Sequence, residues 1–438
     1  MKYRAAFAMA LAALILTAGA AEPAADITPA AESAAPAVTT QEPPAAAVAS
    51  GKPLYILNSG GTAPEFAITD TAAYLPMKFG ATLLATKIDF ATAQQQVLCS
   101  VDGCSHVDAG CPAFMAADDD ALSHYYTGGL VAAGDRLYWF INGGASPVNV
   151  RVDVSALDGS NRHTIVENGS TFQLDCTMSM RFTDGDALYL ATAASSLVRL
   201  DDTGLTSVFP LNDGHPTPEN PLYTQDNTPR CTILGCWQDM AVFACTPSLS
   251  GSGTGLIGVH ADGSVTDLGS YSIDFGSPTD WISTLHDGKL YYVPGSGDQA
   301  ETIEVTDLAA QTTETLPLPA GGDWNNYCIA YGDGTIGLIR NEINYAWTPG
   351  SDTAIELAPT WCKDTAVARS PVIYAENGTI ALIKVSDRAI STPQLTPEGL
   401  PYQRQQTIRE LALIPLQDLF SGGQNWTPVA MLDGALFD

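Results

Sequence analysis

The sequence has few basic residues and a low density of charge. Lysine and arginine account for 19 of its 438 residues, against 48 aspartates and glutamates, so the formal net charge is −29 at pH 7. A surface of this sign repels phosphate backbones and acidic lipid headgroups, which disfavours nucleic acid and acidic membranes as partners. Charged residues make up 15% of the chain and hydrophobic residues 45%. This composition excludes a wholly disordered protein and is sufficient for a large core.

Motifs of the common enzyme classes are also missing. The chain contains no G-x-S-x-G nucleophile elbow, no H-E-x-x-H metalloprotease helix and no phosphate-binding loop. Five of the six histidines are isolated in the sequence: His124, His163, His215, His260 and His286. We therefore predict no catalytic residue from the sequence, which leaves enzymatic activity undecided and favours a protein that is not an enzyme.

The N-terminus predicts a bacterial export signal over residues 1–20. Two basic residues precede a short apolar run, and an Ala-Gly-Ala cleavage site occupies 18–20. The sequence at 16–19 is like a lipobox, but Ala20 stands where the lipid-bearing cysteine belongs. We expect a secreted or cell-surface protein that reaches a membrane only through an uncleaved signal.

Residues 21–52 separate this signal from the folded part of the chain. They are rich in alanine and proline and contain no aromatic residue, a composition that predicts a disordered or extended linker. The first strand-like run begins just after Pro53, at 54–57. We therefore expect one folded domain over 53–438.

A turn that runs into a β-rich strand recurs along most of this domain. Clear copies, each with an Asp-Gly, Gly-Asp or Asn-Gly pair, lie at 134–139, 185–190, 287–293, 333–338 and 377–382, and a weaker copy lies at 238–243. Such turns are the strongest short-range signal for a β-hairpin. Successive copies are separated by roughly 44–53 residues, close to the period of propeller blades.

A second turn follows each of these first turns. The second turns lie at 157–161, 201–204, 261–264, 307–311, 349–352 and 421–424, and a further one lies upstream at 87–94. Two hairpins per repeat give four strands, which is one propeller blade. We therefore predict an all-β fold, a single closed β-propeller of four-stranded blades. Seven blades are favoured, and six blades with a strand-swapped closure are the alternative.

Three of the nine cysteines lie close to a histidine within the segment 99–115. These four residues are Cys99, Cys104, His106 and Cys111. Three thiols and an imidazole can form a tetrahedral structural zinc site, although the spacing is tighter than in ordinary zinc fingers. An exported protein can also form disulfides, so a disulfide within this loop is the alternative. Isolated cysteines within strands, such as Cys245, are predicted to be core thiols.

The same segment resembles one seen in a group of bacterial secreted and surface β-propeller proteins, many of them lipoproteins. The motif is Leu98-Cys99, then Cys104-x-His106, then Cys111-x-Ala113, and the Asp-Gly-Ser-Asn turn at 158–161 also fits. The resemblance implies a propeller fold and a location outside the cytoplasm, and it implies no activity. The missing lipobox cysteine departs from the lipoprotein pattern.

Aromatic residues beside amides indicate where a ligand could bind. The predicted contacts are Trp324, Asn325, Tyr327 and Trp426. Flat rings next to amide groups suit carbohydrate or peptide recognition in loops at a propeller face. We therefore predict a monomeric, non-enzymatic extracellular module that binds a glycan, peptide or protein. The alternative is an extracellular polysaccharide hydrolase or lyase whose acids come from separate blades.

Overall fold

The computed structural model describes most of the predicted domain. The described residues are 52–57, 66–79, 82–117, 129–142, 149–170, 174, 180–191, 196–209, 230–246, 254–271, 283–292, 301–321, 324, 328–331, 334–340, 343–357, 372–395, 399–423, 425–432 and 435–436. The predicted signal and all of the predicted linker except Lys52 lie outside them. Within these ranges, no helix is both long and apolar enough to span a membrane.

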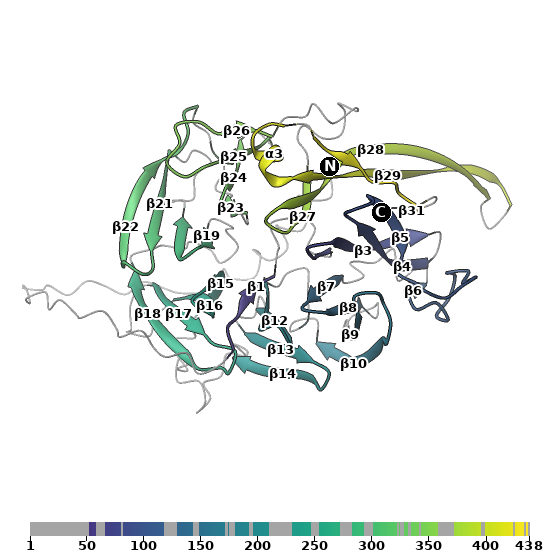
Figure 1. Ribbon diagram of the computed structural model, residues 1–438, viewed down its shortest axis with the longest axis horizontal. Helices are drawn as coiled ribbons and strands as arrows, with labels where there is room; N and C mark the ends of the chain where they lie inside the picture. Colours follow the sequence, from purple (N-terminus) through teal and green to yellow (C-terminus); the bar gives the residue numbers. More distant parts are fainter. Residues whose placement is uncertain are drawn as a thin grey trace, which may run out of the picture. The chain divides into compact units, whose positions relative to one another are not determined.

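The described strands form seven antiparallel sheets arranged in a ring, a seven-bladed β-propeller (Figure 1). Blade one contains β2 (Ala67–Ile68), β3 (Ala72–Phe79), β4 (Thr82–Asp89), β5 (Gln94–Val97) and β6 (Phe114–Ala117). Blade two contains β7 (Leu130–Ala133), β8 (Arg136–Asn142), β9 (Asn149–Ala156) and β10 (His163–Ser170). Blade three contains β11 (Met180–Thr183), β12 (Leu188–Ala191), β13 (Leu197–Asp201) and β14 (Gly204–Phe209). Blade four contains β15 (Arg230–Trp237), β16 (Met240–Thr246), β17 (Thr254–Val259) and β18 (Val265–Tyr271). Blade five contains β19 (Ser283–His286), β20 (Lys289–Tyr292), β21 (Thr302–Asp307) and β22 (Thr312–Pro317). Blade six contains β23 (Cys328–Ala330), β24 (Ile336–Arg340), β25 (Ile343–Trp347) and β26 (Ile355–Glu356). Blade seven contains β27 (Val372–Glu376), β28 (Ile380–Leu395), β29 (Pro401–Pro415) and β30 (Thr427–Pro428), and the short helix α3 (Leu416–Phe420) precedes β30. The predicted fold and the favoured blade number are confirmed.

The predicted turns join the strands as expected. The first turn of a repeat connects strands one and two of a blade, and the second connects strands three and four. Gly134, between β7 and β8, has a φ of 61°, a left-handed conformation that suits glycine. A Cβ atom at Gly134 would stand 2.6 Å from the carbonyl oxygen of Gly185, the corresponding turn residue of the next blade. Glycine is therefore required both by the turn and by the close approach of two blades.

The first turn of blade one does not follow the glycine pattern. Between β2 and β3 the hydroxyl of Thr69 accepts hydrogen bonds from the backbone N–H groups of Thr71 (3.4 Å) and Ala72 (3.2 Å). A threonine side chain thus stabilises this turn in place of glycine. This explains why the sequence marks only the second half of the first blade.

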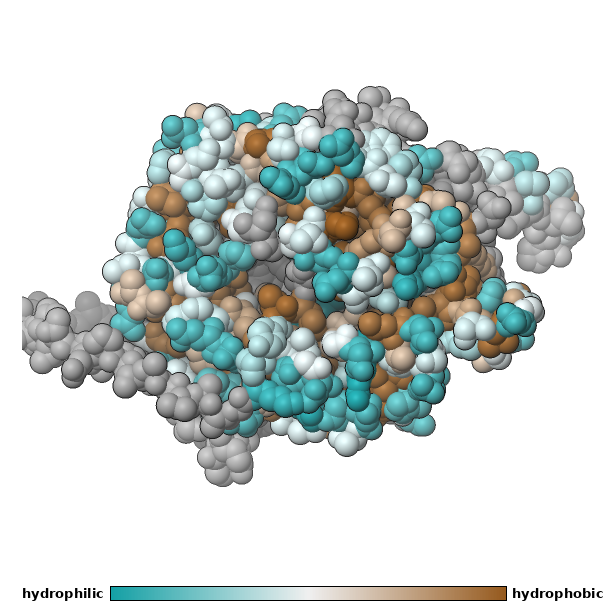
Figure 2. Space-filling view, in the orientation of Figure 1, coloured by the Kyte–Doolittle hydropathy of each residue, from teal (hydrophilic) through white to brown (hydrophobic). Residues whose placement is uncertain are grey.

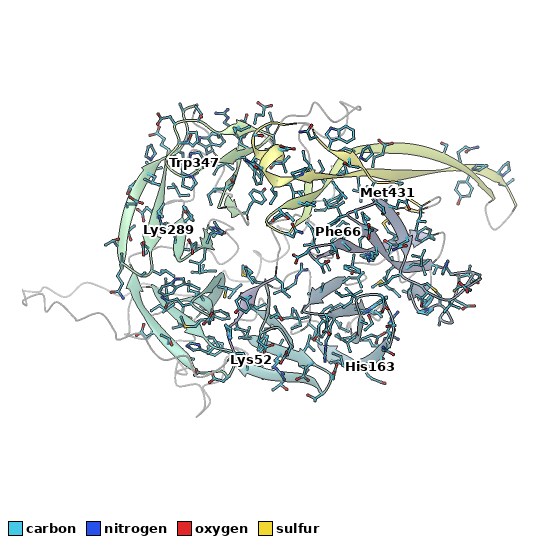
Figure 3. The ribbon with its side chains drawn as sticks, viewed as in Figure 1. Lys52, Phe66, His163, Lys289, Trp347 and Met431 are labelled. Atoms are coloured by element: carbon cyan, nitrogen blue, oxygen red, sulfur yellow. The ribbon has the colours of Figure 1, made fainter. Side chains whose placement is uncertain are left out.

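Neighbouring blades pack face to face, so central strands are buried on both sides. In β8, Leu137, Trp139 and Ile141 join a core cluster with blade one, whereas Tyr138 and Phe140 join a cluster with blade three. The alternation of side chains along a strand places these two sets on opposite faces. A continuous apolar run results, and each large buried side chain contributes about 1.5–3 kcal/mol. Trp347 in blade six is likewise buried (Figure 3).

The ring is closed by the C-terminal segment on the first blade. β31 (Ala435–Leu436) pairs with β3, and Ala430 forms a bridge with Gln94. The ring of Phe66 also contacts Tyr374 of blade seven edge to face, with a centroid distance of 5.1 Å. At the other end of the chain, β1 (Tyr55–Ile56) adds a fifth strand to blade three. Residues from both ends of the domain therefore secure the ring.

One hairpin extends beyond its blade. β28 and β29 pair from Ile380 to Leu395, whereas β27 pairs with β28 only as far as Lys384. Figure 1 shows this ribbon projecting from the ring. On the face seen in Figure 2, hydrophilic and hydrophobic residues are interspersed around the ring.

Candidate metal centre and adjoining pocket

The structure brings together the four residues of the predicted zinc motif. The three thiol sulfurs and one imidazole nitrogen, from Cys99, Cys104, His106 and Cys111, all lie within 4.8 Å of one another. They belong to the loop of residues 98–113 between β5 and β6, which we call the Cys/His loop. The three cysteines are not in disulfides. The Cys/His loop therefore presents four convergent donor atoms.

Local turns produce this convergence. The backbone N–H of Cys104 donates to the carbonyl of Val101 (3.2 Å), and that of Cys111 donates to the carbonyl of Asp108 (3.0 Å). The two turns thus accompany the convergence of the sulfurs of Cys104 and Cys111 with the other ligand atoms. His106 lies between the turns with a φ of 58°, a left-handed conformation unusual for a residue with a side chain. The two turns and the left-handed conformation of His106 thus bend the backbone of the loop around the four donor atoms.

The environments of the thiols differ. A hydrogen bond from the backbone of His106 lowers the pKa of Cys104. Burial instead raises the pKa of Cys111 to about 12, and its sulfur lies 3.2 Å from Nδ1 of His106. A divalent cation would deprotonate such a thiol on binding, because the ion stabilises the thiolate.

The donor set fits zinc. Zinc in structural sites takes four cysteine or histidine ligands in a tetrahedron, with Zn–S distances of about 2.3 Å and Zn–N distances of about 2.0–2.1 Å. Donor atoms so placed lie roughly 3.5–4 Å apart by geometry, within the 4.8 Å limit found here. Three cysteines and one histidine form a recognised structural set, and soft thiolates favour zinc over magnesium or calcium.

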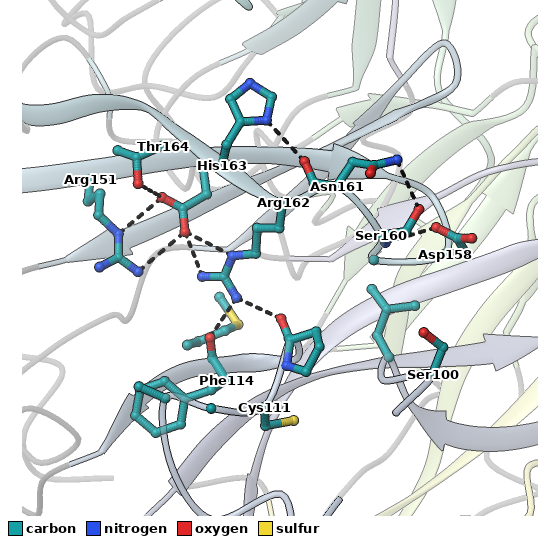
Figure 4. Close-up of a pocket in the computed structure, with 17 residues that line it drawn as sticks. Ser100, Cys111, Phe114, Arg151, Asp158, Ser160, Asn161, Arg162, His163 and Thr164 are labelled. Carbon is teal, nitrogen blue, oxygen red and sulfur yellow. Dashed lines mark hydrogen bonds and ion pairs between the residues drawn. The ribbon is translucent and has the colours of Figure 1, made fainter. Parts of the chain in front are cut away.

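A pocket of about 590 Å³ adjoins the loop (Figure 4). One wall is formed by the Cys/His loop and the start of β6, including Cys111, Pro112 and Phe114. The opposite wall is formed by β9, by the turn at 158–161 and by the start of β10. The pocket therefore lies between blades one and two, next to the candidate metal centre.

Arg162 connects the two walls. Its Nη1 donates to the carbonyl oxygens of Pro112 (3.0 Å) and Phe114 (2.6 Å). Its Nε and Nη2 bind the carboxylate of Asp153 at 2.8 and 2.7 Å. The guanidinium also lies over the ring of Trp139, 4.0 Å from its centroid. Charge, hydrogen bonding and stacking together fix this side chain between the blades.

Burial and charge act in opposite directions on Arg162. Burial lowers its pKa, and the negative charge of Asp153 and the hydrogen bond to it counteract this shift. The side chain is 14% exposed, and that of its partner Asp153 is 6% exposed. Arg162 is thus a buried cation held between a carboxylate and the Cys/His loop.

Both carboxylates in the pocket wall have structural partners. Asp153 also binds Nε of Arg151 (3.1 Å) and accepts a hydrogen bond from the hydroxyl of Thr164 (2.8 Å). Asp158 accepts a hydrogen bond from the backbone N–H of Ser160 (2.9 Å) in the blade-two turn. Hydrogen bonds from Ser160 lower the pKa of Asp158. A general acid in glycoside cleavage needs the opposite shift, toward a raised pKa.

Of the four predicted aromatic and amide contacts, the structure describes Trp324 and Trp426, which belong to different core clusters. Trp324 is 1% exposed, its indole N–H donates to the carbonyl of Pro319 (2.8 Å), and Arg340 lies over its ring. Trp426 packs against a different core cluster, between blades six and seven. Asn325 and Tyr327 lie outside the described residues. The described contacts of Trp324 therefore explain it as a core residue, and the ligand role predicted for these positions stays a prediction.

The prediction for Cys245 is wrong. Cys245 is disulfide-bonded and 1% exposed. It stands opposite Cys231 in the register of β15 and β16. Cysteines far apart in the sequence become neighbours only when a hairpin sets its register, which isolated inspection of each strand does not show.

The comparisons with known proteins show similarity of low degree. No family model matches the chain, and no curated protein matches it. Among solved structures, a candidate 6-phosphogluconolactonase from Bacteroides fragilis is 11% identical with a TM-score of 0.39, and the match covers 78% of this chain and 96% of that one. TolB from Acinetobacter baumannii is 11% identical with a TM-score of 0.32, covering 78% of this chain and 77% of that one. The tricorn protease is 10% identical with a TM-score of 0.24; the match covers 83% of this chain but 30% of the protease. The class defined by the sheets themselves is a seven-bladed β-propeller, and the function has to be argued from the residues of this chain.

Proposed function

We propose that the protein is an exported β-propeller binding module whose ligand site is the pocket beside the Cys/His loop. The observation that carries this proposal is that both carboxylates in the pocket wall are already bound by neighbouring groups. Asp153 is bound by two arginines, and hydrogen bonds lower the pKa of Asp158. Neither is suited to deliver a proton, so the pocket favours recognition over acid catalysis.

The wall of the pocket offers groups that can bind a polar ligand. The side chain of Arg151 is 44% exposed although it pairs with Asp153. His163 is exposed, and its Nδ1 faces the carbonyl of Asn161 at 3.0 Å. Phe114 adds an aromatic surface to the opposite wall. A cation, an imidazole and a ring around one cavity suit an extracellular glycan or peptide.

Within this module, the Cys/His loop would hold a structural zinc ion. Cys99, Cys104, His106 and Cys111 would be the ligands, and the ion would fix the loop without any open coordination position. A disulfide would leave one thiol and the imidazole without a role, whereas a metal uses all four donors. The zinc ion supplies a cross-link, and this chain's residues form the pocket.

The predicted export signal and the acidic composition support an extracellular site of action. The predicted signal and the resemblance to secreted propellers point outside the cell, and the net charge of −29 disfavours nucleic acid. In this proposal the protein acts as a monomer that binds a glycan, peptide or protein.

Glycan and peptide arrays with the protein lacking residues 1–20 test the ligand site. Arg151→Ala and His163→Ala should each weaken binding of the best array ligand roughly 10–100-fold, since a hydrogen bond to a charged group contributes about 1.5–3 kcal/mol. Arg199→Ala is the control, because Arg199 likewise lies in the third strand of its blade and pairs with an aspartate two residues further on, Asp201, but does not line the pocket. Unchanged affinity in both pocket variants would place the site elsewhere.

The hydrolase or lyase alternative is tested in parallel. Extracellular polysaccharides that bind on the array are incubated with the protein, and new reducing ends or unsaturated products are measured. Turnover that survives purification and is lost in Asp153→Asn or Asp158→Asn would overturn the binding-module proposal.

A further inference from the structure

The two walls of the pocket are held by different means. The ends of the Cys/His loop are anchored to β4, where Leu98 donates to the carbonyl of Ala85 (3.0 Å) and Ala85 donates to that of Ala113 (2.8 Å). Between these anchors, Cys104 and Cys111 make backbone bonds to residues three positions earlier. Such local turns constrain a loop weakly, and ordering each residue costs about 1–2 kcal/mol of backbone entropy. The opposite wall belongs to the ladder of β9 and β10.

The last metal ligand of the loop is directly followed by the groups that Arg162 binds. Cys111 precedes Pro112, whose carbonyl accepts from Arg162, and the carbonyl of Phe114 is the second acceptor. Phe114 is itself placed by a hydrogen bond from its N–H to the carbonyl of Cys111 (3.0 Å). A cross-link at the sulfur of Cys111 would therefore fix the carbonyl of Pro112, whereas Phe114 is also held by the pairing of β6 with β4.

From Arg162 the connection continues into blade two. Two of its nitrogens hold Asp153 on β9, and Arg162 immediately precedes His163 in the pocket wall. Figure 4 shows the guanidinium of Arg162 beside Phe114, with its hydrogen bonds drawn as dashed lines. Arg162 thus contacts both the segment that follows Cys111 in blade one and Asp153 in blade two.

We propose that metal bound to the Cys/His loop controls the order of the whole pocket, and that Arg162 is the positioning residue that transmits this control from blade one to blade two. The inference rests on the proposed metal site. With metal bound, the carbonyls of Pro112 and Phe114 are fixed and Arg162 is held by four hydrogen bonds. Without metal, the carbonyl of Pro112 moves with the loop, and Arg162 keeps its bonds to Asp153 and to Phe114, which the pairing of β6 with β4 holds in place. Ligand affinity at the pocket then depends on metal, and the coupling is reciprocal.

Hydrogen exchange with metal alone as the probe tests this coupling. The full-length mature protein is measured zinc-loaded and after chelation, with exchange read in peptides covering 99–117 and 158–166. In the unmodified protein, chelation should speed exchange in both peptides. In Arg162→Met, chelation should speed exchange in 99–117 alone, because the connection between the walls is cut. Arg199→Met should behave as the unmodified protein.

Metal affinity gives a second readout. Competition between a chromogenic chelator and the protein should show zinc bound roughly 10–100-fold more weakly in Arg162→Met, the usual effect of removing a group that orients metal ligands. Arg162→Lys keeps the charge but loses the forked geometry, so its affinity should lie between the two. Circular dichroism and the unfolding midpoint confirm that each variant is folded.

The outcomes separate the inference from the proposal on which it rests. Absence of zinc binding to the unmodified protein overturns both. Zinc binding with unchanged exchange in 158–166 after chelation leaves the metal site standing and overturns the coupling. Equal responses of Arg162→Met and Arg199→Met in exchange and in affinity also overturn the role of Arg162.

Discussion

Replacing Gly134 by alanine should destabilise the ring more than the same change at Gly185. Both glycines have a positive φ, 61° and 90°, so alanine at either position costs about 1–2 kcal/mol of backbone strain. At Gly134 the new Cβ would also stand 2.6 Å from the carbonyl oxygen of Gly185, whereas at Gly185 nothing lies within 4 Å of the added atom. Overpacking of this kind adds about 1–3 kcal/mol. The total is then about 2–5 kcal/mol at Gly134 against about 1–2 kcal/mol at Gly185.

Urea unfolding followed by tryptophan fluorescence measures the difference. The midpoint should fall in both variants and fall further in Gly134→Ala, and Gly350→Ala, with a φ of 86° and open space around its Cβ position, should match Gly185→Ala. Equal midpoints for Gly134→Ala and Gly185→Ala would refute the reasoning that the turns of adjacent blades are in tight backbone contact.

Three further predictions concern the loop, the pocket turn and ring closure. His106→Ala should release zinc and lower the thermal midpoint of the metal-loaded protein, and after chelation the variant should melt with the unmodified protein; a chelator-independent difference would argue against a metal ligand. Because hydrogen bonds from Ser160 lower the pKa of Asp158, its contribution to stability is present above the unfolded pKa and is lost as the pH falls through the folded pKa. Asp158→Asn should therefore lose less stability than the unmodified protein in urea melts between pH 5 and pH 2, and parallel losses would contradict this. Deleting residues 430–438 removes β31 and the bridge to Gln94, so the thermal unfolding transition should broaden and shift to lower temperature. A transition with unchanged width and midpoint would show that ring closure depends on other contacts.

The repeat made the architecture predictable from the sequence. Turns such as 287–293 determine both the chain reversal and the strand that follows, because glycine and aspartate favour the left-handed conformations these turns need. The residues of each turn were therefore sufficient to predict the hairpins that repeat from blade to blade.

The pocket could not be predicted, because its residues meet only through the packing of blades. In the sequence, Asp153 is an ordinary strand residue and Arg162 directly precedes a strand. The importance of Arg162 comes from its bonds to carbonyls about fifty positions earlier. A buried charge within an apolar strand was the available signal: Asp153 stands between Val152 and Val154. The four candidate metal ligands were found because they lie within thirteen residues, whereas the burial of Trp324 could not be predicted because it depends on neighbouring strands.

The central claim is that the Cys/His loop is a metal centre that forms one wall of a binding pocket. Elemental analysis combined with thiol counting, on protein purified from the culture medium without chelators, tests it most directly. The account predicts one zinc per chain, protection of Cys99, Cys104 and Cys111 from alkylation until zinc is removed, and loss of zinc in His106→Ala. A metal-free protein in which two of these three thiols are joined in a disulfide would contradict it.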